Sequence, residues 1–184
     1  MNKTGIAILL GFIVFCGLSP LYGAEPPRSP IDINLIIDGS AALANTKEEI
    51  TAWVFKRFDQ MFVEGDRVTV WNAGGTARIV YNNRINNEAD REAFRKSIQD
   101  ISAAGSSADL SGALREAAAR ESSGLCYTLL ISASPMALSS LLSGPQANLL
   151  RFSRVEEFSG WRALVIGLNL DTRVRNAAAE FFGS

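Results

Sequence analysis

Apolar runs alternate with amphipathic stretches along most of the chain after residue 30. Three runs are short and nearly continuously apolar: "IDINLIID" (31–38), "CYTLLIS" (126–132) and "WRALVIGL" (161–168). Such runs are typical of strands covered on both faces, because a half-exposed strand would alternate apolar and polar positions. We therefore expect three strands at widely separated points of the chain.

A β-hairpin is predicted after the first of these strands. Residues 67–71 and 77–81 flank Gly74-Gly75, which is the strongest local turn signal in the chain. Glycine provides the positive φ that tight hairpin turns need. A phosphate-binding loop is excluded here, because it would need a lysine after the last glycine and the chain contains no Gly-Lys pair.

The stretch "NTKEEITAWVFKRFDQMF" predicts the first helix. Thr46 and Glu49 have the spacing of a capping box, in which the two residues satisfy free amides of the first turn. A wide apolar stripe follows at helical spacing, which must pack on a flat surface such as a sheet. The residues of this stripe are Ile50, Trp53, Val54, Phe58, Met61 and Phe62.

Further helices alternate with the later strands. Residues 86–101 are amphipathic, with Asn86 or Asn87 as the cap and with an apolar face made of Phe94, Ile98 and Ile101. A loop of small residues leads into a helix that begins near Asp109. The stretch 136–158 is helical or irregular and is interrupted at Gly144-Pro145. A closing helix spans 171–182, with Asp171 or Thr172 as its cap.

The resulting order is β-α-β-β-α-α-β-α-β-α. Strands that alternate with helices predict an α/β fold: a three-layer, doubly wound, mainly parallel sheet with helices on both faces. The tight hairpin makes one strand antiparallel to its neighbour, as occurs at a sheet edge.

The first 24 residues differ from the rest of the chain. Lys3 is followed by an apolar core from Ile6 to Phe15 and by an imperfect cleavage site at residues 21–24, a pattern typical of a secretory signal peptide. An uncleaved N-terminal anchor is the alternative, because the uncharged stretch is long enough to cross a membrane. Residues 25–30 form a Pro-rich linker and residues 31–184 form the domain. The domain is expected to be exported to the periplasm, the cell envelope or the extracellular space.

Composition excludes several classes of function. The formal net charge is −1 and no block of basic residues occurs, so nucleic acid is not an expected partner. Contact with a membrane is expected only through an uncleaved N-terminal segment. The chain has no histidine, which excludes Ser-His-Asp and Cys-His catalysis and histidine-ligated zinc.

Cys126 is the one cysteine that remains once residues 1–24 are removed. It cannot form an intramolecular disulfide, so core packing has to hold the fold together. Because Cys126 opens an apolar run, a buried and inert thiol is expected.

Candidate chemistry gathers where the predicted strands end. Ligands of doubly wound sheets bind beyond the carboxyl ends of the strands, near the point where the strand order reverses. Asp38 ends the first strand, and Ser132 and Ala133 lie at the end of another. The loop 105–109 begins a helix on the same rim. Three separate segments are therefore expected to converge at one place.

These segments, in this order, resemble a von Willebrand factor A (vWA) domain over residues 31–182. "INLIIDGSAAL" is similar to the first strand of the family with its Asp-x-Ser-x-Ser turn, and "EGDRVTVWNAGGTARIV" to its hairpin. "AAGSSADLSGALREAA" resembles the loop that usually reads Gly-Gly-Thr-x-Leu. "TLLISASP" resembles the fourth strand, which usually ends Thr-Asp-Gly, and "WRALVIGL" resembles the fifth.

The resemblance implies a degenerate metal-ion-dependent adhesion site. In the family this site holds a hard cation such as Mg²⁺ on oxygen ligands and leaves one position open for a carboxylate of the partner. Asp38 and Ser40 match the first two ligands, whereas alanine occupies the other three positions: Ala42, Ala108 and Ala133. We expect no bound metal and no other cofactor. Mg²⁺ binding is the alternative if Ser106, Ser107 or Asp109 compensates through a shifted loop.

The leading hypothesis is a non-enzymatic module for adhesion or scaffolding that binds a protein partner without metal. Its contact surface would be the rim carrying residues 38–43, 105–109 and 133–138, which is expected to be small, polar and exposed. The candidate rim residues are Asp38, Gly39, Ser40, Ser106, Ser107, Asp109 and Ser134. Structural roles compete for three of them: Asp38 and Ser40 in the turn, and Asp109 as a helix N-cap.

Three other functions stay open at this stage. The second is a metal-dependent adhesion domain with a variant Mg²⁺ site. The third is a phosphatase-like hydrolase with Asp38 as nucleophile. Such enzymes carry an Asp-x-Asp motif at the strand end, and Ser40 replaces the second aspartate, which is their usual acid catalyst. The fourth is a purely structural scaffold subunit, with the closing helix and the region of Trp161 as contact surface.

Overall fold

The structure is a computed structural model, and it describes residues 28–122, 124–152, 160–168 and 170–183. The predicted signal peptide and the first half of the linker lie outside these residues. No helix within the described ranges is both long and apolar enough to cross a membrane.

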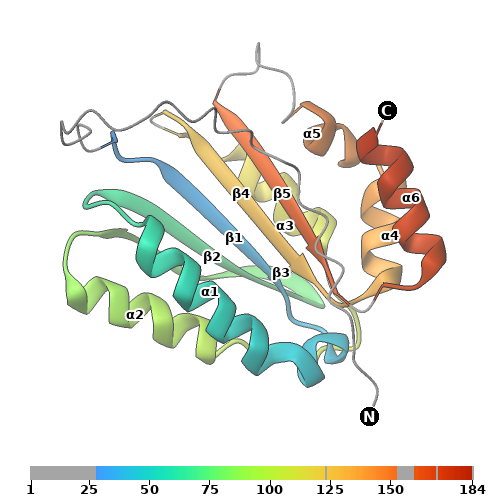
Figure 1. Ribbon diagram of the computed structural model, residues 1–184, viewed down its shortest axis with the longest axis horizontal. Coiled ribbons are helices and arrows are strands. Elements are labelled where there is room, and N and C mark those ends of the chain that lie inside the picture. The colour runs from blue at the N-terminus through green and yellow to red at the C-terminus, as the bar shows by residue number, and fades with distance from the viewer. Residues whose placement is uncertain (1–27, 123, 153–159, 169, 184) are drawn as a thin grey trace, which may run out of the picture.

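Five strands form one sheet: β1 (Asp32–Asp38), β2 (Asp66–Gly74), β3 (Thr76–Ile85), β4 (Cys126–Ser132) and β5 (Trp161–Gly167). The strand order is β3-β2-β1-β4-β5 (Figure 1). Strands β2, β1, β4 and β5 pair in parallel, and β3 pairs antiparallel with β2 at one edge. The predicted fold class is confirmed, including the antiparallel edge strand.

Helices cover both faces of the sheet and make three layers (Figure 1). On one face lie α1 (Lys47–Met61) and α2 (Glu88–Gln99). On the other lie α3 (Leu110–Ala119), α4 (Pro135–Ser143), α5 (Ala147–Phe152) and α6 (Thr172–Gly183). A 3₁₀ helix, η1 (Ala41–Thr46), connects β1 to α1. The break predicted at Gly144-Pro145 separates α4 from α5.

Two apolar clusters form the core, one on each face of the sheet. Ile33, Leu35 and Ile37 of β1 belong to the cluster under α1 and α2, whereas Ile36 belongs to the cluster under the opposite helices. All seven residues of β1 are buried, as expected for the central strand of a parallel sheet. The continuous apolar character of this segment therefore follows from burial on both faces.

The capping box predicted for α1 is wrong. Thr46 makes no side-chain cap, and its hydroxyl donates to the carbonyl of Leu43 at 3.3 Å. The helix α1 continues from η1, so its first amides follow a preceding helical turn and the side-chain cap is not formed. The apolar stripe predicted for α1 also includes one residue too many, because Met61 is 52% exposed.

The other predicted caps are present. Asn87 accepts a hydrogen bond from the amide of Asp90 at 3.0 Å and begins α2. Asp109 accepts from the amide of Gly112 at 2.9 Å, and Asp171 accepts from that of Val174 at 2.8 Å. These short-range patterns formed as predicted, because each helix begins directly after a loop and its first amides have no other partner.

An ion pair that the sequence analysis missed fixes the start of the domain. Arg28 donates to both carboxylate oxygens of Asp66 and to the carbonyl of Met61. The fully buried Asp66 also accepts from the amides of Ile31 and Val63, each at 2.9 Å. The linker is thereby attached to the amino end of β2. The predicted rim lies at the other end of the sheet, where the parallel strands have their carboxyl ends.

Candidate functional site

Strands β1 and β4 are the neighbours between which the strand order reverses. Their carboxyl ends carry Asp38 and Ser132, and both side chains are fully buried. The hydroxyl of Ser132 donates to Oδ2 of Asp38 at 2.6 Å. The predicted convergence of these two strand ends is confirmed at the switch point of the sheet.

Both oxygens of Asp38 are occupied by donors from its own chain. Oδ1 accepts from the amide of Ser40 at 2.7 Å, and Oδ2 accepts from the amide of Ala133 at 3.2 Å in addition to the Ser132 hydroxyl. These three donors satisfy the hydrogen-bonding capacity of a carboxylate that is out of contact with solvent. Asp38 thus ties the turn after β1 to the turn after β4.

The loop 100–109 is the third segment of the rim. Its Gly105 donates to the carbonyl of Gly39 at 3.0 Å and accepts from the amide of Ala41 at 2.8 Å. Ser107 accepts from the amide of Gly75 at 2.9 Å, which joins the loop to the β2–β3 turn. Gly75 has a φ of 31°, in line with the predicted role of a glycine in that turn. Backbone bonds therefore hold the rim together.

Asp109 and Ser134 have capping roles in this structure. The second oxygen of Asp109, Oδ2, accepts from the amide of Ala77 at 3.3 Å, so this side chain faces the hairpin. Ser134 accepts from the amide of Ala137 at 3.3 Å and begins α4. The helix-capping role anticipated for Asp109 is confirmed.

The predicted exposure of the rim needs correction at its centre. Asp38 is fully buried and Gly39 is also buried, whereas Ser40 is only 4% exposed. The loop 100–109 covers them, because Gly105 bonds directly to the backbone of residues 39–41. Ser106, Ser107, Ala41 and Ala42 are exposed and form the accessible surface of the rim.

Asn72 is a rim residue that the sequence did not reveal. It is buried on β2, and a Cβ on Gly39 would lie 2.0 Å from its Oδ1. Only glycine fits at position 39, because the Asn72 side chain and the backbone of Gly74 fill the space. Oδ1 of Asn72 and Oγ of Ser40 are buried and have no hydrogen-bond partner among the described residues.

Cys126 lies at the opposite end of β4 from the rim and is buried. Burial, together with the nearby charge of Asp32, raises the pKa of the thiol to about 11. A thiol with this pKa is almost wholly protonated near neutral pH, and the thiolate is the reactive form. The expected inert character of Cys126 agrees with this environment.

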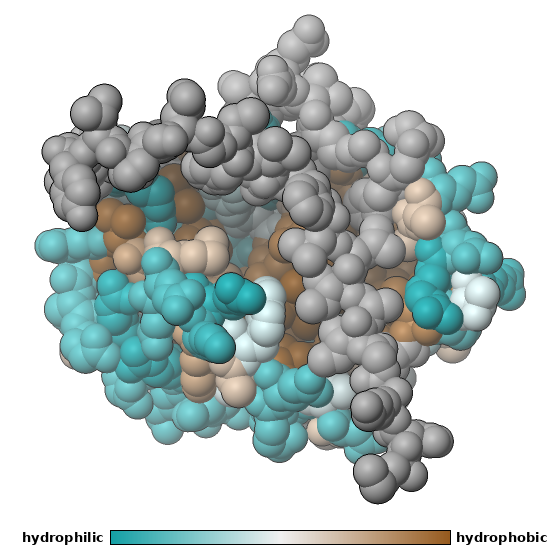
Figure 2. All heavy atoms as spheres, in the orientation of Figure 1, coloured by the Kyte–Doolittle hydropathy of each residue, from teal (hydrophilic) through white to brown (hydrophobic). Residues whose placement is uncertain are grey.

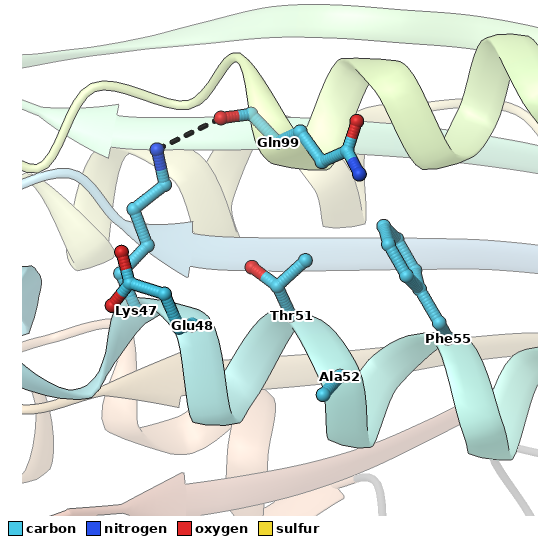
Figure 3. A pocket seen from close by; sticks show the side chains of 6 residues that line it. All are labelled: Lys47, Glu48, Thr51, Ala52, Phe55 and Gln99. Atoms are coloured by element: carbon cyan, nitrogen blue, oxygen red, sulfur yellow. Dashed lines mark hydrogen bonds between the residues drawn. The ribbon is translucent and has the colours of Figure 1, made fainter.

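A shallow groove runs between α1 and α2 (Figure 3). Lys47 crosses one end of it and donates to the carbonyl of Gln99 at 2.8 Å, and Phe55 lines the other end. Glu48 is its one acidic residue, so the groove contains no pair of carboxylates for acid–base chemistry. The groove offers no clear candidate site.

Comparisons with known proteins identify the fold. No protein-family model matches the chain, and no curated protein matches it by sequence. Solved structures do match. The von Willebrand factor type A structure from Catenulispora acidiphila has a TM-score of 0.50 at 16% identity, over 83% of this chain and 41% of that one.

Two further structures agree with the first. BatB from Bacteroides thetaiotaomicron matches at a TM-score of 0.51 and 13% identity, over 73% of this chain and 65% of BatB. Proximal thread matrix protein 1 from the mussel byssus, with a zinc-occupied metal-ion-dependent adhesion site, matches at 0.52 and 15% identity. That match covers 74% of this chain and 35% of the mussel protein. The chain therefore has a vWA-like fold, and it spans less than half of the first and third of these proteins.

The residues at the switch point supply few side-chain oxygens for a cation such as the zinc in the mussel protein. Three family ligand positions hold Ala42, Ala108 and Ala133, which supply no side-chain oxygen. Both Asp38 oxygens already accept hydrogen bonds. Among the described residues, no group of three or more acidic or cysteine side chains could hold a metal ion. Mg²⁺ prefers a nearly octahedral set of oxygens, which these residues do not provide.

Proposed function

We propose that this protein is a non-enzymatic interaction module of vWA type that binds a protein partner without a metal ion. The observation that carries the proposal is the state of Asp38, whose two oxygens are engaged by Ser40, Ser132 and Ala133. In a metal-dependent site this carboxylate would be directed at the cation. Here it holds two turns together and supports a rim built by the backbone.

The accessible rim has a chemistry that suits a neutral partner surface. Around Ala41, Ser106 and Met136 its exposed residues are uncharged, and the one large apolar side chain there is Met136, which is 84% exposed at the start of α4. This uncharged part of the rim could bind a partner through its shape, its backbone polar groups and one flexible thioether. Methionine is common at protein-binding surfaces because it adapts its shape to the partner.

Export is a further part of the proposal and rests on the N-terminal pattern, which lies outside the described residues. The predicted signal peptide over 1–24 would deliver the domain to the periplasm, the cell envelope or the extracellular space. An adhesion or scaffold role is compatible with any of these places.

A metal-dependent adhesion domain is the second candidate, because one observation favours it. Oγ of Ser40 is buried beside Asp38 and has no partner among the described residues. An unpartnered buried oxygen is costly, and a cation would satisfy it. A hydrolase is not favoured, because a nucleophilic carboxylate must reach its substrate and Asp38 is fully buried.

Affinity capture from an envelope extract of the source cell, followed by mass spectrometry, tests the proposal. We expect a protein that binds the wild-type chain equally with and without EDTA and is lost with Ser106→Arg combined with Ser107→Arg. The matched control is Thr51→Arg combined with Ala52→Arg on the α1 groove, which should retain the partner. Loss of the partner on chelation would instead support the metal-dependent candidate.

A further inference from the structure

Met136 is the most exposed of the large apolar side chains that the structure describes. It is 84% exposed, whereas the next most exposed of these side chains, that of Met61, is 52% exposed. Met136 is the second residue of α4, and Leu138 and Leu141 of the same helix are buried. With about 3.6 residues in a helical turn, these two leucines lie on the side of α4 opposite to Met136. The thioether of Met136 therefore faces solvent while the helix packs on the core.

Hydrogen bonds on the N-terminal side of Met136 hold its backbone at the rim. The amide of Ala133 donates to the carboxylate of Asp38 at 3.2 Å, which fixes the turn between β4 and α4. The hydroxyl of Ser134 accepts from the amide of Ala137 at 3.3 Å and caps the first turn of α4. None of these bonds involves the Met136 side chain. A chemical change in that side chain would therefore alter the surface of the rim and leave its framework in place.

The other sulfur atoms of the described residues have different surroundings. Cys126 is 6% exposed, and burial raises the pKa of its thiol to about 11, so an oxidant meets neither an accessible sulfur nor a thiolate. Figure 2 shows mostly hydrophilic surface over α1, the helix that ends at Met61. The carbonyl of Met61 accepts from Arg28 at the amino end of the sheet. Met61 is thus a half-exposed thioether at the end of the sheet opposite to the rim.

We propose that Met136 is an oxidation site through which hydrogen peroxide switches off partner binding at the rim. The inference rests on the function proposed above, because it concerns the regulation of the same contact surface. A lone pair of the Met136 sulfur attacks one oxygen of the peroxide, the O–O bond breaks, and an S–O bond forms. The other oxygen leaves as water with both protons. The sulfur thereby loses two electrons, which the peroxide gains.

The product changes the chemistry of the contact surface. Methionine sulfoxide is polar, whereas the thioether is flexible and apolar. A partner surface that fits the thioether leaves the sulfoxide oxygen without a donor, and burying such an oxygen is unfavourable. Methionine sulfoxide reductases restore the thioether at the expense of thiols, so the switch is reversible. The export proposed above would place the rim in an oxidising compartment, where peroxide has access to it.

Peptide mass mapping after graded exposure to hydrogen peroxide tests the oxidation site. In the folded protein, as isolated from an expressing cell, we expect Met136 to gain one oxygen about twice as fast as Met61 or faster, because it is the more exposed of the two. In denaturant the two rates should be equal, which is the internal control. Equal rates in the folded protein, or a faster reaction at Met61, would overturn the proposal.

Capture of the partner from the envelope extract tests the switch. Met61→Leu leaves Met136 as the exposed methionine of the described residues, and Met136→Leu is the matched control that leaves Met61. Each variant is oxidised, freed of peroxide and then used for capture. We expect Met61→Leu to bind the captured protein about tenfold or more weakly in Kd after oxidation. Treatment with methionine sulfoxide reductases should restore binding, and Met136→Leu should bind equally before and after oxidation.

The outcomes separate this inference from the function on which it rests. If Met61→Leu with fully oxidised Met136 retains the partner, the switch is overturned and the interaction module stands. Equal losses of binding in the two variants would also overturn the switch, because the effect would not come from Met136. If untreated wild type captures no protein, the proposed function and the switch fall together, and the mass map still decides on the oxidation site.

Discussion

Asp38 shows how one residue type serves two purposes at the same place in a fold. A strand-end aspartate beside a serine is typical of a cation site or a nucleophile. In this chain its oxygens accept hydrogen bonds from two backbone amides and the Ser132 hydroxyl. The residue therefore stabilises the rim, and its removal should be visible as a loss of stability.

Asp38→Ala is expected to destabilise the fold by about 2–4 kcal/mol, because it leaves buried donors without an acceptor. Urea unfolding followed by tryptophan fluorescence measures the change. Asp100→Ala is the matched control, since the Asp100 side chain is 63% exposed and its removal should have little effect. Equal midpoints for the two variants would contradict the structural role of Asp38.

Gly39 is the other residue whose role depends on its neighbours. Gly39→Ala should destabilise the fold by about 2–4 kcal/mol, because its Cβ would lie within 3 Å of Asn72 and of the Gly74 backbone. Asn72→Ser should restore part of this loss, since it removes the closest atom. Gly124→Ala, where a Cβ meets nothing within 4 Å, is the control. Thermal unfolding of the single and double variants measures the coupling.

At the scale of elements, hydrogen bonds and ion pairs attach loops and linkers to the sheet. The segment before β1 is held at the amino end of β2 by Arg28 and Asp66. Burial alone would raise the pKa of Asp66, but the Arg28 guanidinium and the amides of Val63 and Ile31 hold it below its ordinary value. Asp66 therefore stabilises the fold above the pKa that it has in the unfolded chain.

This contribution is lost as the pH falls through the lowered pKa of Asp66, so wild-type stability should decrease on the acid side of about pH 4. Arg28→Gln removes the cation and lets burial raise the pKa of Asp66. At neutral pH the variant should lose about 1–3 kcal/mol, a modest figure because Arg28 is 37% exposed and solvent screens the pair. Part of that loss should disappear as the pH falls.

Melting temperatures between about pH 3 and pH 7 measure this difference. Arg84→Gln is the matched control: Arg84 also donates to a backbone carbonyl of this region, that of Gly65, but has no carboxylate partner among the ion pairs described. Its pH profile should run parallel to that of the wild type. Parallel profiles for both variants would contradict the role assigned to Arg28.

The whole molecule joins a rim at one end of the sheet to the attached linker at the other end. The rim lies at the carboxyl ends of the strands, whereas Arg28 and Asp66 lie at their amino ends.

Divalent cations should have no effect on this molecule if the rim works without them. Melting temperatures should remain unchanged, within about 1 °C, in Mg²⁺, Mn²⁺ or EDTA, since a ligand that binds only the folded chain would raise them. The variant Ala42→Ser with Ala133→Asp restores two family ligands and serves as the comparison. A cation-dependent rise in the wild-type protein would favour the variant metal site around Ser40.

Much of the fold follows from local patterns in the chain. The strand segments, the Gly74-Gly75 turn and the caps Asn87, Asp109 and Asp171 were predictable because each depends on residues close in sequence. The α1 cap was wrong because η1 precedes the helix. Alanine at positions 42, 108 and 133 is likewise a property of the sequence, and it limits any metal site without reference to coordinates.

Tertiary structure decided what those local patterns could not. Asp38 meets Ser132 at a separation of 94 residues, and Arg28 meets Asp66 at a separation of 38. The burial of Gly39 and Ser40 depends on Gly105, and the position of β5 beside β4 depends on the strand order. Hydrophobic period and capping are short-range effects, whereas the partner of a buried polar group depends on which distant segment the fold brings beside it.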